Sequence, residues 1–175
     1  CISRACRTGR GRRAGGPLRW AARLSVNLEA PSEARLAMLA PKKDFEHGLV
    51  EPLERAWAIV RRLRNAGQRV AYAGATTQYV VGPAGESDQE LLATSQRLYR
   101  PFALRRASHS AFSPISDTPL QHQQATLPLR EHRLYQPDLL LRQYGSSAAQ
   151  PHIVRTRHLS IERNPKPPWH TANTQ

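Results

Sequence analysis

The sequence has few of the residues from which disulfide frameworks, metal sites and large cores are built. Its 175 residues include two cysteines, Cys1 and Cys6, which are too few for a disulfide framework or a zinc site. Aromatic residues make up 6% of the chain, one methionine is present, and 14 prolines interrupt the sequence. We therefore expect a modest core, with further burial supplied by partners. No apolar run approaches the roughly 20 residues of a membrane-spanning helix, so we expect no transmembrane segment.

Spacings typical of catalytic and metal-binding sites are also missing. Seven histidines are scattered along the chain, and no two stand where one helix face would present both to a metal. The loop "GPAGESDQE" has neither the Lys-Ser/Thr pair of a P-loop nor the third glycine of a dinucleotide loop. Its three acidic residues would repel phosphate. We therefore predict that the chain is not an enzyme and binds no cofactor or metal.

Positive charge is abundant and unevenly distributed along the chain, whose formal net charge is +13. Residues 1–28 contain seven arginines and no acidic residue, residues 29–90 are almost balanced, and residues 91–175 contain eleven basic and four acidic residues. Basic ends of this kind recruit polyanions by releasing counterions, and RNA is the usual partner. A charge run that only keeps a tail soluble, or addresses it to an organelle, is an equally weighted alternative.

The first residues have the composition of an import signal. The stretch "GGPLRWAARLS" can place Leu18 and Leu24 on one side of a helix and Arg19 and Arg23 on another, a pattern typical of mitochondrial presequences. Met38 offers another interpretation, in which "MLAPKKDFEHG" begins translation and the preceding residues are upstream sequence. We expect residues 1–31 to be a basic arm or import-type leader, and the protein to be mitochondrial, in the matrix or on the matrix side of the inner membrane.

Regular structure is expected mainly within residues 32–100. Ser32 is a suitable N-cap for a short helix that ends at Pro41. The stretch "EPLERAWAIVRRLRNAG" predicts a longer helix, because proline stands in its first turn, glutamates begin it and arginines end it. Its apolar residues recur at helical spacing and predict a face for the core or a partner, formed by Leu53, Trp57, Val60 and Leu63.

The rest of this segment predicts a hairpin and a second helix. "RVAYA" and "QYVV" indicate two strands joined at "GATT", and "SDQELLATSQRLY" indicates a helix that begins with a Ser87–Glu90 capping box. The predicted fold class is α+β with low regular content. It consists of a small α-β-β-α unit at about 48–100, an extended basic N-terminal arm, and a long Pro-rich, mostly irregular C-terminal tail over residues 101–175. Within the tail, "PDLLLRQYG" predicts about two helical turns.

Arginines of the two basic ends are the candidate contacts with RNA or partner proteins. In the C-terminal part they alternate with tyrosine, histidine and tryptophan, which can stack on unpaired bases or anchor a protein interface. The candidates are Arg10, Arg12, Arg13, Arg105, Arg106, Arg130, Arg133, Arg155 and Arg157. The string "LRRAS" also matches the pattern that basophilic kinases accept and makes Ser108 a candidate phosphorylation site.

These features favour a non-catalytic structural subunit of a large mitochondrial assembly. The first choice is a mitochondrial ribosomal protein that wraps rRNA and neighbouring proteins. The alternative is a matrix-side accessory subunit of a respiratory-chain complex or the ATP synthase, with protein surfaces and the anionic lipid cardiolipin as partners. Both classes share the leader, the charge and the small core.

Overall fold

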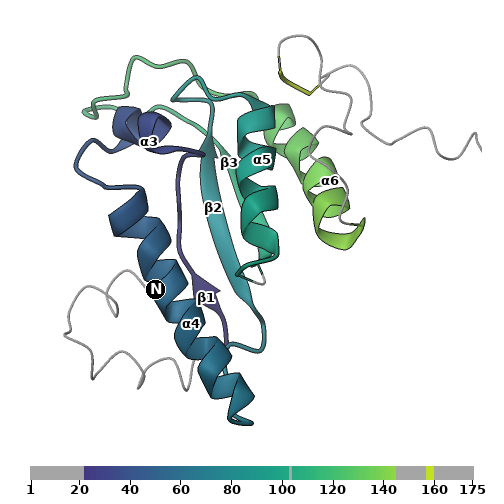
Figure 1. The fold of residues 1–175 in the computed structure, drawn as a ribbon. Helices are drawn as coiled ribbons and strands as arrows, with labels where there is room; N and C mark the ends of the chain where they lie inside the picture. The colour runs from purple at the N-terminus through teal and green to yellow at the C-terminus, as the bar shows by residue number, and fades with distance from the viewer. Residues whose placement is uncertain (1–21, 103, 145–156, 160–175) are drawn as a thin grey trace, which may run out of the picture.

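The computed structural model describes residues 22–102, 104–144 and 157–159, which form a layer of helices packed on a small parallel sheet (Figure 1). The three strands are β1 (Leu24–Ser25), β2 (Ala75–Val81) and β3 (Leu104–Ala111). The four α-helices are α3 (Glu33–Leu39), α4 (Glu51–Asn65), α5 (Asp88–Tyr99) and α6 (Pro128–Tyr144). A short π-helical turn, Glu46–Val50, leads directly into α4.

The strands follow one another across the sheet in chain order, and both neighbouring pairs are parallel. Leu24 pairs with Ala75 at the start of the sheet, and Tyr79 pairs with His109 further along it. Helices α3 and α4 connect β1 to β2, and α5 connects β2 to β3. Since such crossovers are almost always right-handed, two successive steps in one direction place their helices on the same face of the sheet.

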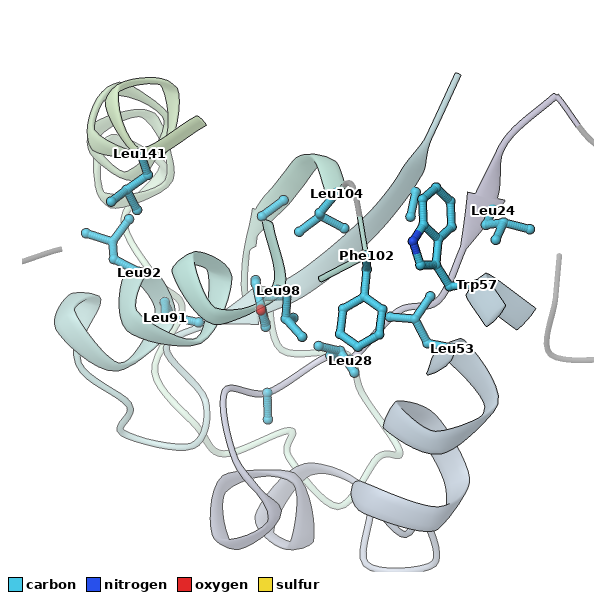
Figure 2. Packing of buried hydrophobic residues seen from close by; sticks show 14 of the residues in the cluster. Leu24, Leu28, Leu53, Trp57, Leu91, Leu92, Leu98, Phe102, Leu104 and Leu141 are labelled. Carbon is cyan, nitrogen blue, oxygen red and sulfur yellow. The ribbon is translucent and has the colours of Figure 1, made fainter. Parts of the chain in front are cut away.

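Burial along β2 shows which face this is. Residues at alternate positions, from Ala75 to Val81, are at most 2% exposed, whereas Thr76, Gln78 and Val80 between them are half-buried. The buried face packs on one hydrophobic cluster to which all three long helices contribute (Figure 2). On the other face the Gln78 amide donates a 3.2 Å hydrogen bond to the Ser110 hydroxyl. The sheet therefore has one buried, mainly apolar face and one more polar face.

Helix α6 lies beside α5 and covers the outer edge of β3 (Figure 1). The Tyr135 hydroxyl accepts a 3.4 Å hydrogen bond from the His109 backbone N–H and donates a 3.0 Å bond to the His109 carbonyl. The Glu131 carboxylate accepts a 2.9 Å bond from the N–H of Ala111, and Arg142 donates a 2.9 Å bond to the carbonyl of Arg105. Side chains of one helix thus take the place of a fourth strand, which protects the edge from pairing with another chain.

Helix boundaries agree with the local signals in the sequence. The Ser32 side chain accepts a hydrogen bond from Arg35 N–H at the start of α3, and Ser87 and Glu90 form the reciprocal capping box of α5. Helix α4 has its proline in the first turn, with Glu51 and Glu54 beside it. These three predicted helices are confirmed.

The predicted hairpin is wrong, and so is the irregular tail where β3 and α6 form; residues 145–156 and 160–175 of the tail lie outside the described residues. No strand forms over residues 69–73, and β2 pairs in parallel with β3, a strand inside the segment expected to be irregular. Helix α6 has 17 residues, far more than the expected two turns, and it continues through Pro137. The fold is α/β rather than α+β, and its regular content is higher than expected.

Candidate nucleic-acid interface

Helix α4 carries opposite charges at its two ends. Glu51 and Glu54 lie in the first turn, and Arg62 and Arg64 lie in the last turn, an arrangement that the helix dipole stabilises. Arg61 and Arg62 are exposed, while the buried face of the same helix packs in the core. The basic end of α4 projects beyond the other helices (Figure 1). Positive charge is therefore gathered at one extremity of the molecule.

The loop after α4 brings further residues to this extremity. Ala73 N–H donates a 2.9 Å hydrogen bond to the Ala22 carbonyl, and Leu24 N–H donates a 3.1 Å bond to the Gly74 carbonyl. Arg23 therefore lies next to the loop. We call the surface formed by Arg23, Arg61, Arg62, Arg64, Arg69 and Tyr72 the arginine tip. Within the described part of the chain, no ion pair joins these arginines to a carboxylate.

Arg64 fixes the conformation of the loop. Its Nε donates a 3.1 Å hydrogen bond to the Val70 carbonyl, and Nη2 donates a second bond to the Ala71 carbonyl. The guanidinium carbon lies 5.1 Å from the centroid of the Trp57 ring. Val70 and Ala71 are buried, and Ala71 has a φ of 43°, a left-handed conformation that is unfavourable for alanine. The loop is thus anchored to α4 and to the core.

Tyr72 and Arg69 form a stacked pair on the arginine tip. The Arg69 guanidinium carbon lies 4.8 Å from the centroid of the Tyr72 ring. Tyr72 is 57% exposed, whereas the other described aromatic side chains are buried or half-buried. The tip therefore combines a phosphate-binding group with an accessible ring.

A second group of exposed arginines lies at the base of α5 and β3, formed by Arg97, Arg100, Arg105 and Arg106. The Arg106 guanidinium carbon lies 5.2 Å from the Tyr135 ring centroid. A shallow groove of about 440 Å³ separates α4 from the turn at Pro101 and Phe102, and Arg61 of the tip lines it. Glu54 is the acidic residue of the groove lining, which also includes Arg55. The groove thus joins Arg61 of the tip to the turn that follows Arg100.

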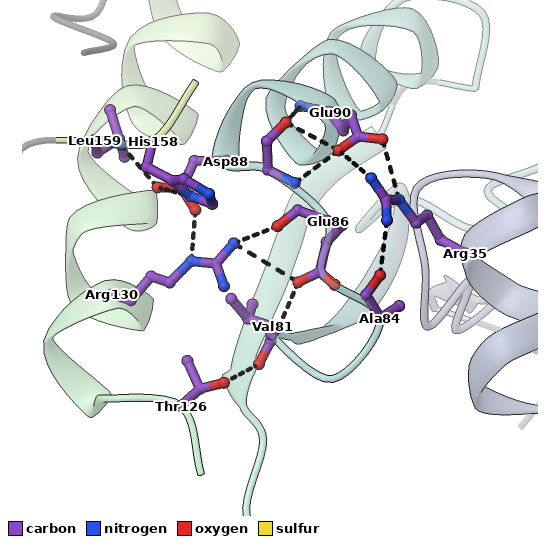
Figure 3. A network of polar contacts seen from close by, with 12 residues as sticks. Arg35, Val81, Ala84, Glu86, Asp88, Glu90, Thr126, Arg130, His158 and Leu159 are labelled. Atoms are coloured by element: carbon purple, nitrogen blue, oxygen red, sulfur yellow. Dashed lines mark hydrogen bonds and ion pairs between the residues drawn. The ribbon is translucent and has the colours of Figure 1, made fainter. Parts of the chain in front are cut away.

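The opposite end of the sheet holds the carboxyl ends of the parallel strands, where α/β folds bind ligands. Glu86 and Asp88 lie there, each 1% exposed (Figure 3). Arg130 donates a 2.8 Å hydrogen bond from Nε to Asp88 and a 2.7 Å bond from Nη2 to the Glu86 carbonyl. The second Asp88 oxygen accepts a 2.8 Å bond from the N–H of Leu159. These contacts hold α6 and residues 157–159 against the start of α5.

The same end of the sheet is also tied to α3. Arg35 forms a 3.2 Å ion pair with Glu90 and donates a 2.8 Å hydrogen bond to the Ala84 carbonyl (Figure 3). Among the described residues, no group of three histidine, cysteine or acidic side chains could hold a metal ion. None of the helices in this part of the chain is long and apolar enough to cross a membrane.

His109 is a titratable ring in the core, with no exposed surface. It stacks on Tyr79 at a centroid distance of 5.8 Å and meets the edge of Tyr135 at 5.6 Å. Neither ring nitrogen has a hydrogen-bond partner among the described residues. Burial lowers the pKa of His109 to about 4, although the nearby Asp88 carboxylate acts in the opposite direction. His109 is therefore a neutral core residue without access to a substrate.

The predicted apolar face of α4 lies in the core. Leu53, Trp57 and Val60 are at most 3% exposed, and Leu63 is half-buried against the same cluster. Ser108, the candidate phosphorylation site, is half-buried within β3 and lies opposite Gln78 on the polar face of the sheet. A kinase would need access to this face.

The predicted arginine contacts are placed in different environments. Arg105 and Arg106 are exposed at the start of β3, Arg130 is engaged with Asp88, and Arg133 is half-buried on α6. Arg157 is exposed and accepts a 3.2 Å hydrogen bond from Gln89 N–H through its carbonyl. Four candidates lie outside the described residues: Arg10, Arg12, Arg13 and Arg155.

The arginine tip itself was not predicted, apart from the roles of Arg61, Arg62 and Arg64 at the end of the helix. The net charge of the middle of the sequence is close to zero, because acidic residues at helix starts offset arginines at helix ends. A net charge summed over the segment therefore does not reveal the tip. The signal that could have revealed the tip is the separation of charge within α4, followed by Arg69 and Tyr72 in the next loop.

Comparison with known proteins finds no match. No family model matches the sequence, and no curated protein or solved structure is significantly similar to it. The function is therefore inferred from the sequence and from the geometry of the described residues.

Proposed function

We propose that this chain is a non-catalytic structural subunit of a large mitochondrial assembly, and that its arginine tip contacts RNA. The first choice is the mitochondrial ribosome. The observation that carries the proposal is the tip itself, where five arginines lie together without a carboxylate partner in the described structure. Guanidinium groups whose charge no carboxylate neutralises form, at one extremity, the electrostatic footprint expected of a phosphate-binding surface.

Other features support a structural role. The carboxyl ends of the strands, where an α/β enzyme would bind its substrate, are closed by the pairing of Arg130 with Asp88 and Glu86. Residues 1–21 of the expected basic arm lie outside the described residues, and they would add to the RNA contact and supply the mitochondrial address. Residues 22–31 belong to the fold instead, since β1 lies in the sheet and Leu24 and Leu28 are buried in the core. The arginine group at the base of β3 would extend the contact along the surface from the tip.

Salt dependence tests the RNA contact. In the first variant, Arg62 and Arg69 are replaced by glutamine. In the control, glutamine replaces Lys42 and Lys43, two exposed cations outside the tip and the groove, so the change in net charge is the same. If each tip arginine neutralises one phosphate, the slope of log K against log salt should decrease by about 1–2 in the tip variant. The control variant should keep the slope of the natural chain.

Sedimentation of mitochondrial lysates tests the assembly. The natural chain and the control variant should sediment with ribosomal RNA and be released by ribonuclease, whereas the tip variant should remain in the light fractions. Circular dichroism verifies that all three chains are folded. Equal sedimentation and equal salt slopes for the two variants would contradict the RNA contact. If the natural chain instead sediments with detergent-solubilised membrane complexes and resists ribonuclease, the accessory-subunit alternative is correct.

A further inference from the structure

We infer that Tyr72 is a stacking platform for an unpaired base of the bound RNA. This inference rests on the proposed function and specifies which form of RNA the arginine tip prefers. A ring that binds a base needs an accessible face, a fixed position and phosphate-binding groups within one nucleotide of it. The described structure provides an observation for each requirement.

Accessibility follows from the exposure of Tyr72. The Arg69 guanidinium covers one face of the ring, and 57% of the residue remains exposed. The opposite face is therefore open to a ligand. A base stacked there would form the third layer of a stack that begins with Arg69, and the guanidinium would attract the phosphate beside that base.

A fixed position follows from the loop that carries the tyrosine. Arg64 binds the carbonyls of Val70 and Ala71, the two residues before Tyr72, and Gly74 N–H donates a 2.8 Å hydrogen bond to the Ala71 carbonyl. Ala71 keeps its left-handed conformation because these contacts and its own burial hold it. An exposed ring on such a loop loses little conformational freedom when a base binds.

The chemistry of the surroundings favours a nucleic acid over an apolar peptide. Arg69 stacks on the ring, and the Ala22–Ala73 and Leu24–Gly74 backbone hydrogen bonds bring the segment of Arg23 alongside the loop that carries Tyr72. Neither arginine pairs with a carboxylate in the described structure. A duplex hides the faces of its bases within the helical stack, so only unpaired nucleotides can use the ring. The tip should therefore bind single-stranded segments, loops or bulges more tightly than duplex RNA.

Tyr72→Leu tests this inference, with Tyr72→Phe as the variant that keeps the ring. The full chain is titrated with a labelled adenosine oligonucleotide and with an RNA duplex that carries the same number of phosphates. We expect Tyr72→Leu to weaken binding of the single strand roughly ten-fold, the value of one base stack. Binding of the duplex and the salt slope should not change, and Tyr72→Phe should bind both RNAs as the natural chain does.

The outcomes separate this inference from the proposed function. If the natural chain binds neither RNA, both fail. If it binds both but Tyr72→Leu binds the single strand as tightly as the natural chain does, only the stacking inference is overturned. An equal loss of affinity for the single strand and the duplex also overturns it, since that result would mean a general effect on the surface. Because Tyr72 is exposed, thermal unfolding of both variants should match that of the natural chain and exclude misfolding.

Discussion

Acidification should destabilise the folded chain through His109, because this ring is buried in its neutral form. Its pKa is lowered from 6.5 to about 4 by burial, with Asp88 opposing this shift and Arg106 adding to it. The unfolded chain therefore binds the proton more readily than the folded chain, and the stability contributed by the neutral ring is lost as the pH falls from 6.5 towards 4. A shift of this size corresponds to about 2 kcal/mol of unfolding free energy lost between pH 7 and pH 5.

His109→Phe isolates this contribution from the carboxyl groups that titrate in the same range. Phenylalanine keeps the aromatic contacts with Tyr79 and Tyr135 and cannot bind a proton. Urea unfolding, followed by circular dichroism at pH 5, 6 and 7, gives the free energy of both chains. We expect the stability of His109→Phe relative to the natural chain to rise by about 2 kcal/mol from pH 7 to pH 5. A constant difference would refute the reasoning and show that the folded chain binds a proton at His109 as readily as the unfolded chain.

Three further substitutions test the packing by urea unfolding at neutral pH. Trp57→Ala should lower the unfolding free energy by about 3–5 kcal/mol, because the ring is buried between α4 and the sheet, and a loss below about 1 kcal/mol would contradict this. Arg130→Met should cost about 3–5 kcal/mol, because two buried carboxylates lose their cation, and a second substitution, Asp88→Asn, should recover part of the loss. Gly82→Ala should cost about 1–3 kcal/mol, because Gly82 has a φ of 109° and an added Cβ would lie 1.8 Å from the Thr126 hydroxyl; unchanged stability would show that the loop after β2 can rearrange.

Helices with local signals could be predicted from the sequence, and the sheet could not. Ser32 and Ser87 cap their helices through residues three positions away, so the information is contained in a few neighbouring letters. A parallel strand finds its partner only after a helix has intervened, and no local pattern specifies that partner. The turn residues at "GATT" suggested a hairpin, although Gly74 in fact ends a loop and the strand begins at Ala75.

Strand β3 was missed, and helix α6 was predicted too short, for opposite reasons. Arg105 and Arg106 at the start of β3 give the sequence the appearance of an exposed basic tail. They are tolerated in a strand because β3 lies at the edge of the sheet, where Arg142 of α6 binds the Arg105 carbonyl. Pro137 marks a probable helix end in a sequence, yet α6 continues through it, since tertiary packing outweighs local preference. The arginine tip was missed because it forms only when the loop after α4 returns to Arg23.

The polar face of the sheet has a consequence for whatever lies against it. Helices follow β1 and β2 before the next strand on the same side, and α6 ends this progression at the outer edge of β3. The side of the sheet away from the buried cluster carries hydroxyl and amide groups from Ser25, Thr76, Gln78, Ser108 and Ser110. A neighbour that covered this side would be recognised by matched donors and acceptors, so its fit would be selective in register and sensitive to single polar substitutions.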